Sequence, residues 1–290
     1  YAGPPAVSPS GAAEALAADA NHTATTAHMA TFLALDAIFT RKGNAFEPTE
    51  LARGPWDPDA QHGGAPAALI AGELERLGDG RPFARIALHL LKPVPLVPLT
   101  LTTEVVRDGR RARRLRADLK AGDETVCFAY ALQLAGSDEP MPEIPLDAPA
   151  LEPPDGAPPA PSFTGYRMFG GDGIEIRFVR GHFSEPGPAT AWFRLRVPIV
   201  EGEPATQLQR AMAAADFGNG ISAAVDWDDY TFVNPELTVY FLRLPEGEWI
   251  GNDAATAIEP GGIGLADAAL HDARGPFGRA LQSLYVSRRR

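Results

Sequence analysis

Nine prolines crowd the stretch between residues 140 and 161 and divide this 290-residue chain into two halves. Proline lacks the backbone N–H that a sheet interior needs, so the stretch predicts a stiff connector. On each side of it the same order of elements recurs, one helix followed by four strands. The last strand of each half carries the tripeptide Ala-Leu-Gln, at 131–133 and 280–282. The repeated order predicts an internal duplication, with two copies of one fold in one chain.

Two apolar stretches have the spacing of helices. The first covers residues 65–77, follows His62-Gly63-Gly64 and stops at Gly78. The second covers residues 207–216, and its apolar residues recur at i, i+3, i+4 and i+7. It ends on the carboxylate of Asp216, which is either an exposed helix end or a buried acid with a shifted pKa.

Alternating apolar and polar residues predict short strands on both sides of the connector. They are expected over residues 46–51, 86–91, 99–107, 111–120 and 125–134, and over 174–182, 190–198, 237–242, 247–258, 264–272 and 279–287. Asp108-Gly109 and Gly122-Asp123 predict hairpins, and Pro186-Gly187-Pro188 is expected to join two strands. A short helix is expected over residues 30–38. Each half is thus predicted to be an antiparallel sheet wrapped around one helix, an α+β arrangement.

The composition narrows the classes of partner. The net charge of −11 argues against nucleic acid, because phosphate binding favours the opposite sign. No run approaches the ~20 apolar residues of a membrane span. The single cysteine, Cys127, excludes an internal disulfide and fits a reducing cytoplasm, and the six scattered histidines show no metal-ligand spacing. Residues 1–29 are expected to be a disordered or vector-derived leader, because His28-Met29 resembles a cloning junction.

Several motifs together resemble the acyl-CoA thioesterase II family, the TesB-like double-hotdog thioesterases, over about residues 30–290. They are His62-Gly63-Gly64, Asp216, Asn234-Pro-Glu-Leu-Thr238 and Gln282. The resemblance implies an α+β double hotdog fold. We expect a first hotdog repeat over residues 30–136, a proline-rich linker over 137–163 and a second repeat over 164–290.

The resemblance also implies an activity, the hydrolysis of acyl-CoA to free acid and CoA without metal or cofactor, by a chain that associates further into a dimer or tetramer. In the family an Asp, a Gln and a Thr hold the hydrolytic water. Asp216 and Gln282 match the first two. The third group is Asn234 or Thr238, and both are expected to point inward because residues 234, 236 and 238 alternate onto one strand face.

The developing oxyanion needs aimed donors, which backbone N–H groups at a glycine-led helix N-terminus provide. His62, Gly63, Gly64 and Ala65 are the candidates. His62 itself is expected to cap the helix or bond a carbonyl. The family's single-hotdog relatives carry their acid nine residues after this histidine, where Ala71 stands, so we expect one surviving site that combines His62-Gly63-Gly64 with Asp216.

Two other functions stay open. One is a non-catalytic acyl-CoA-binding protein, since a halved site can keep its pocket and lose hydrolysis. The other is an enoyl-CoA hydratase or dehydratase, which needs an Asp/His pair and is disfavoured because no histidine lies near Asp216 in sequence. Arg111 and Arg113 belong to a basic strand pair that is either a solvated or subunit-contact face or a dock for the phosphates of CoA. The four tryptophans are expected in the core or at an interface.

Overall fold

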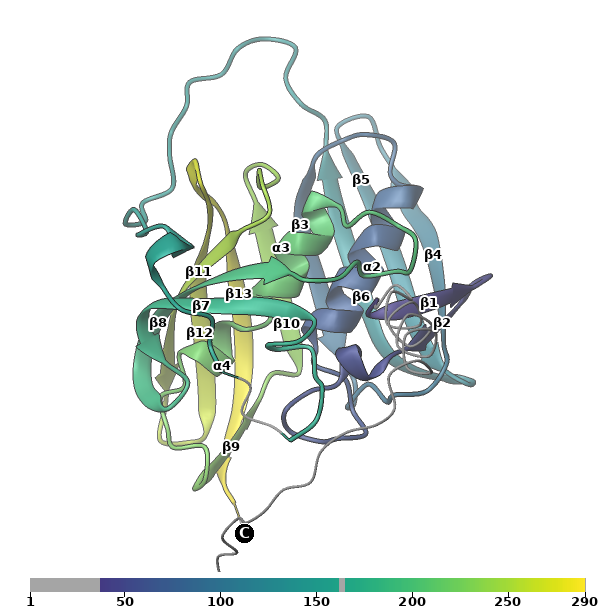
Figure 1. Cartoon of the computed structure of the whole chain (residues 1–290). Coiled ribbons are helices and arrows are strands. Elements are labelled where there is room, and N and C mark those ends of the chain that lie inside the picture. Colours follow the sequence, from purple (N-terminus) through teal and green to yellow (C-terminus); the bar gives the residue numbers. More distant parts are fainter. Residues whose placement is uncertain (1–36, 162–164, 290) are drawn as a thin grey trace, which may run out of the picture. The chain divides into compact units, whose positions relative to one another are not determined.

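Thirteen strands join into one antiparallel sheet in the computed structural model, which describes residues 37–161 and 165–289. The strands are β1 (Phe39–Lys42), β2 (Ala45–Pro48), β3 (Phe83–Leu90), β4 (Leu99–Asp108), β5 (Ala112–Ala121), β6 (Glu124–Leu134), β7 (Ile174–His182), β8 (Glu185–Leu195), β9 (Tyr230–Val233), β10 (Glu236–Phe241), β11 (Ile250–Ile258), β12 (Ile263–Asp272) and β13 (Gly275–Arg288). The helices are α2 (Gly64–Leu77), α3 (Gln207–Ala215) and α4 (Gly218–Ile221), with short 3-10 turns η1 (Glu50–Ala52) and η2 (Pro154–Gly156). Figure 1 shows their arrangement.

The strand order is symmetric about its centre. It runs β1-β2-β4-β5-β6-β3-β10-β13-β12-β11-β8-β7, with β9 attached to β13. Each half thus places the strand that follows its helix, β3 or β10, at the centre, where these two strands pair. Ile86 lies opposite Val239 across this junction, and Ala131 and Ala280 lie opposite them on the outer sides. The two Ala-Leu-Gln tripeptides therefore occupy matching places in the sheet.

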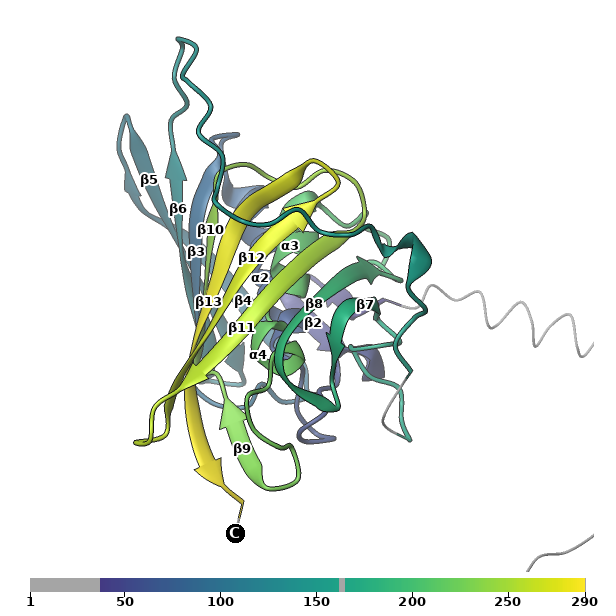
Figure 2. The ribbon, with the colours of Figure 1, turned by 90° about the vertical axis from the view of Figure 1, so that its left-hand side faces the viewer.

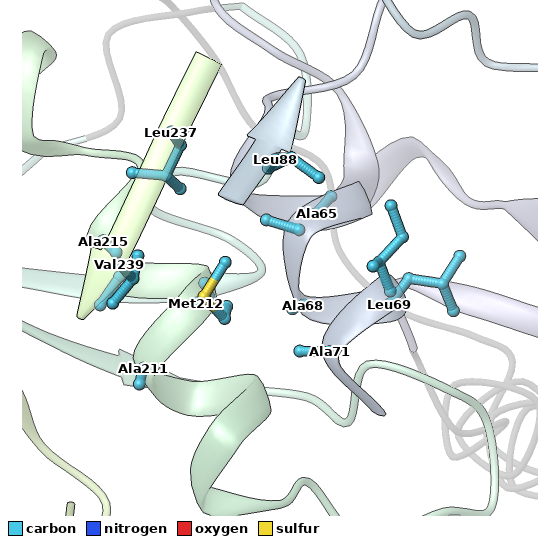
Figure 3. Close-up of a cluster of buried hydrophobic side chains, with 14 of the residues drawn as sticks. Ala65, Ala68, Leu69, Ala71, Leu88, Ala211, Met212, Ala215, Leu237 and Val239 are labelled. Carbon is cyan, nitrogen blue, oxygen red and sulfur yellow. The ribbon is translucent and has the colours of Figure 1, made fainter. Parts of the chain in front are cut away.

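The two long helices lie side by side on one face of the sheet, which curves around them (Figure 2). Small residues line their contact and let the backbones approach closely. Figure 3 shows Met212 of α3 beside the alanines of α2, with Leu88 and Val239 contributed by the two central strands. The side chains of all three are buried. The core is therefore continuous across the halves.

Most predicted elements are confirmed, but two boundaries were wrong. The strand expected over residues 46–51 ends at Pro48, after which Thr49 caps η1 by accepting a hydrogen bond from the Leu51 N–H. Pro186-Gly187-Pro188 lies inside β8 and not between two strands. The prolines are tolerated because β8 pairs with β11 only from Ala189 onward, so Pro186 and Pro188 do not have to donate to β11, and Gly187 between them donates to the carbonyl oxygen of Ala223.

The two outer strands are covered by other segments. β1 bonds to the chain after β8, with Phe39 N donating to Ile199 O at 2.9 Å. The connector lies along β7, with Ala160 N donating to Ile176 O at 2.7 Å. The expected leader over residues 1–29 lies outside the described residues. So do residues 30–36 of the helix expected over residues 30–38. Within the described ranges no helix has the length and apolarity to cross a membrane.

Candidate active site

A break between two helices positions the carboxylate of Asp216. α3 begins with a capping box in which Thr206 and Gln209 bond each other's backbone N–H groups, and it ends at Ala215. The chain then turns through Asp216 and Phe217 into α4. At the break, the Asn252 side chain donates to the carbonyl oxygen of Ala214, which satisfies a helix end that would otherwise lack a partner. The carboxylate of Asp216 is only 5% exposed.

Amide side chains hold one oxygen of this carboxylate. Asn234 Nδ2 donates to Asp216 Oδ1 at 3.0 Å, and Gln282 Nε2 lies 3.3 Å from the same atom. Asn219 sets the orientation of both amides, because its backbone N–H donates to Gln282 Oε1 and its side chain donates to Asn234 Oδ1. The network fixes the amide N–H groups toward the carboxylate.

The other oxygen faces the start of α2 in the first half. Asp216 Oδ2 lies 3.2 Å from His62 Nδ1, which also accepts a hydrogen bond from the Gly64 N–H at 3.0 Å. A Cβ atom on Gly63 would lie 2.7 Å from Asp216 Oδ2. A glycine is therefore required for this approach. The single site predicted from the two halves has its residues in contact.

Burial sets the protonation of this pair. It raises the pKa of Asp216 to about 7, although the hydrogen bonds from Asn234 and the Gly64 N–H act in the opposite direction. Burial also lowers the pKa of His62 to about 3, so the imidazole is neutral at physiological pH. Because the imidazole is neutral, the 3.2 Å contact between His62 Nδ1 and Asp216 Oδ2 is not an ion pair at physiological pH.

Aromatic rings surround the imidazole. The ring of Phe217 stacks on His62 with centroids 4.2 Å apart, and that of Phe169 lies at 5.3 Å. These rings replace water around His62, which explains why its charged form is disfavoured. They also hold the imidazole plane beside the carboxylate.

A cavity of about 400 Å³ opens beside the carboxylate. Its volume falls in the range of small-molecule sites. His62, Asp216, Asn219 and Asn234 supply polar groups to its wall. Most other lining residues are apolar or aromatic. The cavity is therefore largely apolar, with the polar groups around Asp216 at one part of its wall.

Thr238 does not join this site, so the expectation that it points inward was wrong. Its Oγ1 donates to Glu236 Oε2 at 3.0 Å, and it is partly exposed while Leu237 and Val239 on either side are buried. The alternation argument failed because β10 begins only at Glu236, and Asn234 precedes the strand. Of the two candidates for the third group, Asn234 is the one that bonds the Asp216 carboxylate.

Two of the expected oxyanion donors are already bonded. The Gly64 N–H donates to His62 Nδ1, and the Ala65 N–H donates to His62 O at 3.0 Å. Gly63, His62 and the carboxylate are in contact as expected, but the first turn of α2 is less open than the glycines suggested.

Arg111 and Arg113 lie away from the carboxylate. Arg113 Nη1 donates to the carbonyl oxygen of Leu77 at the last residue of α2, roughly 20 Å along the helix from His62. The Arg113 side chain is buried and pairs with Asp79 and Asp108. The structure therefore does not bring these arginines to the cavity, and a phosphate dock at Arg113 would have to displace its own aspartates. Over residues 37–161 and 165–289, no group of three His, Cys, Asp or Glu side chains gathers to hold a metal ion.

Sequence reasoning missed several residues of the site. Asn219 follows Asp216 by three residues, one helical turn, and this spacing could have been noticed. Trp56 and Trp227 were assigned to the core or an interface, but both line the cavity. Their contact joins loops from different halves, for which the sequence has no local signal.

Two family models match the chain, one in each half. The model described as acyl-CoA thioesterase N-terminal domain matches residues 52–134, and the one described as acyl-CoA thioesterase C-terminal domain matches residues 145–286. The chain belongs to the acyl-CoA thioesterase family. No curated protein matches the chain significantly.

Solved structures of thioesterases are similar to the chain in fold. A putative thioesterase II from Thermobifida fusca YX has a TM-score of 0.70 at 18% identity, over 88% of this chain and 96% of that one. An acyl-CoA thioesterase II, TesB2, from Mycobacterium marinum has a TM-score of 0.60 at 15% identity, over 90% and 98%. A hot dog fold protein of unknown function from Alicyclobacillus acidocaldarius has a TM-score of 0.67 at 16% identity, over 86% and 95%. The predicted α+β double hotdog fold is confirmed.

Proposed function

We propose that this acyl-CoA thioesterase family member hydrolyses an acyl-CoA thioester to a free acid and CoA, with Asp216 as general base. The observation that carries the proposal is a buried carboxylate whose pKa is raised to about 7, beside an apolar cavity. A general base is most effective when its pKa lies near the working pH. Membership of the family supplies the thioester as the bond that is broken.

In the proposed reaction a water oxygen bonds to the thioester carbonyl carbon while ionised Asp216 takes one of the water's protons. Asn234 and Gln282 hold the carboxylate through Oδ1, which leaves Oδ2 to accept the proton. The C–S bond then breaks, and the sulfur leaves as the thiol of CoA with the proton that Asp216 returns. The free acid is the second product.

The oxyanion of the tetrahedral intermediate needs a donor on the side of α2. We assign this role to the backbone N–H of Gly63 at the positive end of the helix dipole. The neutral ring of His62 is a second donor, because Nδ1 accepts from Gly64 and the ring proton is therefore on Nε2.

The first experiment measures release of free thiol from short, medium, long and aromatic acyl-CoAs with wild type and Asp216→Asn. We expect the variant to lose about 10²- to 10⁴-fold in rate and to retain saturable binding of the substrate. Asp267→Asn is the matched control, because this carboxylate is exposed and pairs with Arg279. Binding without turnover in the wild type would instead favour the non-catalytic binding protein.

The contact between His62 and Asp216 favours a second candidate, hydration of a 2-enoyl-CoA. The sequence disfavoured it because no histidine is near Asp216 along the chain, but the structure places Nδ1 of His62 3.2 Å from Oδ2. A hydratase would consume the enoyl double bond without releasing thiol. The loss of the double bond is measured by the decrease of its ultraviolet absorbance. The same panel of substrates, extended by a 2-enoyl-CoA, separates the two reactions.

A further inference from the structure

We propose an orientation for the substrate in the cavity: the acyl group ends against a stacked tryptophan pair, Trp56 and Trp227, and the CoA moiety leaves past Lys92. The inference rests on the proposed function in that it takes acyl-CoA as the ligand. It assigns the residues that limit the length of the acyl group and that bind a CoA phosphate.

The tryptophan pair forms one wall of the cavity from both halves of the chain. Trp56 comes from the loop before α2 and Trp227 from the loop between α4 and β9, and both line the cavity. Their ring centroids are 4.4 Å apart at an interplanar angle of 13°. A stacked pair of indoles offers a broad apolar surface, which suits an acyl group and not a charged one.

Neighbouring residues hold the pair in place. The ring of Phe232 packs edge-on against both indoles, at 5.2 Å from Trp56 and 4.9 Å from Trp227. The guanidinium of Arg289 lies 5.9 Å from the Trp56 ring, and its Nε donates to the carbonyl oxygen of Trp227 at 2.9 Å. Phe232 and Arg289 therefore hold the two indoles in their stacked position, with Trp56 42% exposed at the rim of the cavity.

The charges around the cavity decide which end of the substrate faces the tryptophans. Asp57 follows Trp56, and Asp226 and Asp228 flank Trp227, and all three aspartates are exposed. Three carboxylates beside the pair repel the phosphates of CoA. Of the nearby arginines, Arg289 donates through Nε to the backbone carbonyls of Trp227 and Tyr230, and Arg288 packs over the Tyr230 ring.

Lys92 offers the opposite charge in the lining of the cavity. Among the described residues that line the cavity it is the one lysine or arginine. It follows β3, whose last residue, Leu90, bonds through its N–H to the carbonyl oxygen of Pro235, next to Asn234 of the site. Its partner is Glu124, and both side chains of this pair are well exposed. Exposed pairs of this kind are weak, so a phosphate can replace the glutamate.

Binding of non-hydrolysable thioethers tests the orientation without any turnover. Calorimetry measures the Kd of S-hexyl-CoA, S-hexadecyl-CoA and S-hexyl-pantetheine, which lacks phosphates. We expect Trp56→Ala to shift the ratio of the two CoA affinities about tenfold toward the hexadecyl ligand, because the wall is opened. Trp249→Ala is the matched control, since this tryptophan packs under Arg177 and Arg194 and does not line the cavity.

Lys92→Ala is expected to raise the Kd of S-hexyl-CoA by about three- to tenfold at low salt and by less at high salt. The Kd of S-hexyl-pantetheine is expected to stay unchanged. Lys42→Ala is its control, because Lys42 also forms an exposed pair, with Glu47. Thermal unfolding establishes that each variant is folded, and Trp227→Leu replaces Trp56→Ala if the latter is not.

Two results would overturn the orientation. One is a tryptophan variant that binds both CoA ligands more weakly by the same factor, so that the ratio of the hexyl and hexadecyl affinities is unchanged. That result would place the indoles against the CoA moiety. The other is a Lys92 variant that weakens the pantetheine ligand as much as the CoA ligand. A wild type that binds as expected and hydrolyses nothing would contradict the proposed function and leave the orientation supported.

Discussion

At the scale of single residues, the two oxygens of Asp216 have different partners. Oδ1 accepts from two amides, whereas Oδ2 faces the neutral imidazole of His62. The carboxyl therefore holds a proton on Oδ2 at low pH and must lose it to act as a base. Asp216 and Gln282 are buried, and His62 and Asn234 are partly buried, so little water reaches the carboxylate to reduce the difference between its two oxygens.

The first prediction concerns pH. We expect kcat/KM to rise with pH through about 7, as Asp216 ionises, and to level above it. His62 adds no step between pH ~5 and ~8, because burial holds its pKa at about 3. Measuring kcat/KM for one acyl-CoA at a series of pH values tests for this rise. A rate that stays flat across this range would show that Asp216 does not act as the base.

The second prediction concerns stability. The pKa of Asp216 is about 7 in the folded chain, against 3.8 for the free side chain. Below pH ~4 both states hold the proton, whereas between the two values only the folded state does, so stability is lost as the pH rises toward 7. We expect Asp216→Asn to raise the free energy of unfolding by about 2–4 kcal/mol above pH 7 and by little near pH 4.

Urea unfolding at both pH values measures this difference, with Asp267→Asn as the control. A variant that destabilises at high pH would indicate that the charged carboxylate is well solvated or paired in the folded protein. The stability readout is independent of turnover, so it distinguishes a strained functional acid from a structural one.

The sequence predicted some of these residues well and others not at all. Asp216, Asn234 and Gln282 were chosen from motifs and meet in space. The sequence also predicted one site that combines His62-Gly63-Gly64 with Asp216 across the halves. It did not predict that the imidazole itself contacts the carboxylate, because only the folded sheet brings the two side chains together. Thr238 was misassigned since the alternation of side chains holds within a strand and not across Pro235.

At the scale of elements, the start of α2 is shaped by its closeness to the end of α3. Gly63 has φ −59°, which any residue adopts. Its backbone conformation therefore does not require glycine, and only the lack of space for a side chain does. The Cβ of Gly63→Ala would lie 2.7 Å from Asp216 Oδ2 and push the carboxylate away. We expect kcat to fall by about 10- to 100-fold, measured by thiol release.

Gly136→Ala is the control for this change, because nothing lies within 4 Å of the Cβ it would add. Unchanged kcat in Gly63→Ala, in a folded protein, would mean that the carboxylate moves freely and that its position is not critical. The two long helices, α2 and α3, and most strands were predicted within a few residues, whereas the four-residue α4 was not predicted. β1 and β9 were missed, because four-residue strands show too little alternation to detect.

At the scale of the whole molecule, the pairing of β3 with β10 makes the two halves one sheet. Ile86 is fully buried at this junction, opposite Val239. We expect Ile86→Ala to lower the free energy of unfolding by about 2–5 kcal/mol while the transition stays single. Tryptophan fluorescence and far-ultraviolet circular dichroism should give the same midpoint. Two separate transitions would show that the halves unfold independently.

The covered edges of the sheet have a consequence for how copies of the chain meet. An exposed outer strand is a template on which other chains add strands and grow into fibrils. Here β1 bonds to the segment after β8, and the connector bonds along part of β7. The folded chain is thus protected against such growth where these bonds form. At these covered stretches, a dimer or tetramer of the kind predicted from the sequence is built through side chains on the faces of the sheet and its loops, and these are surfaces that selection can adjust residue by residue.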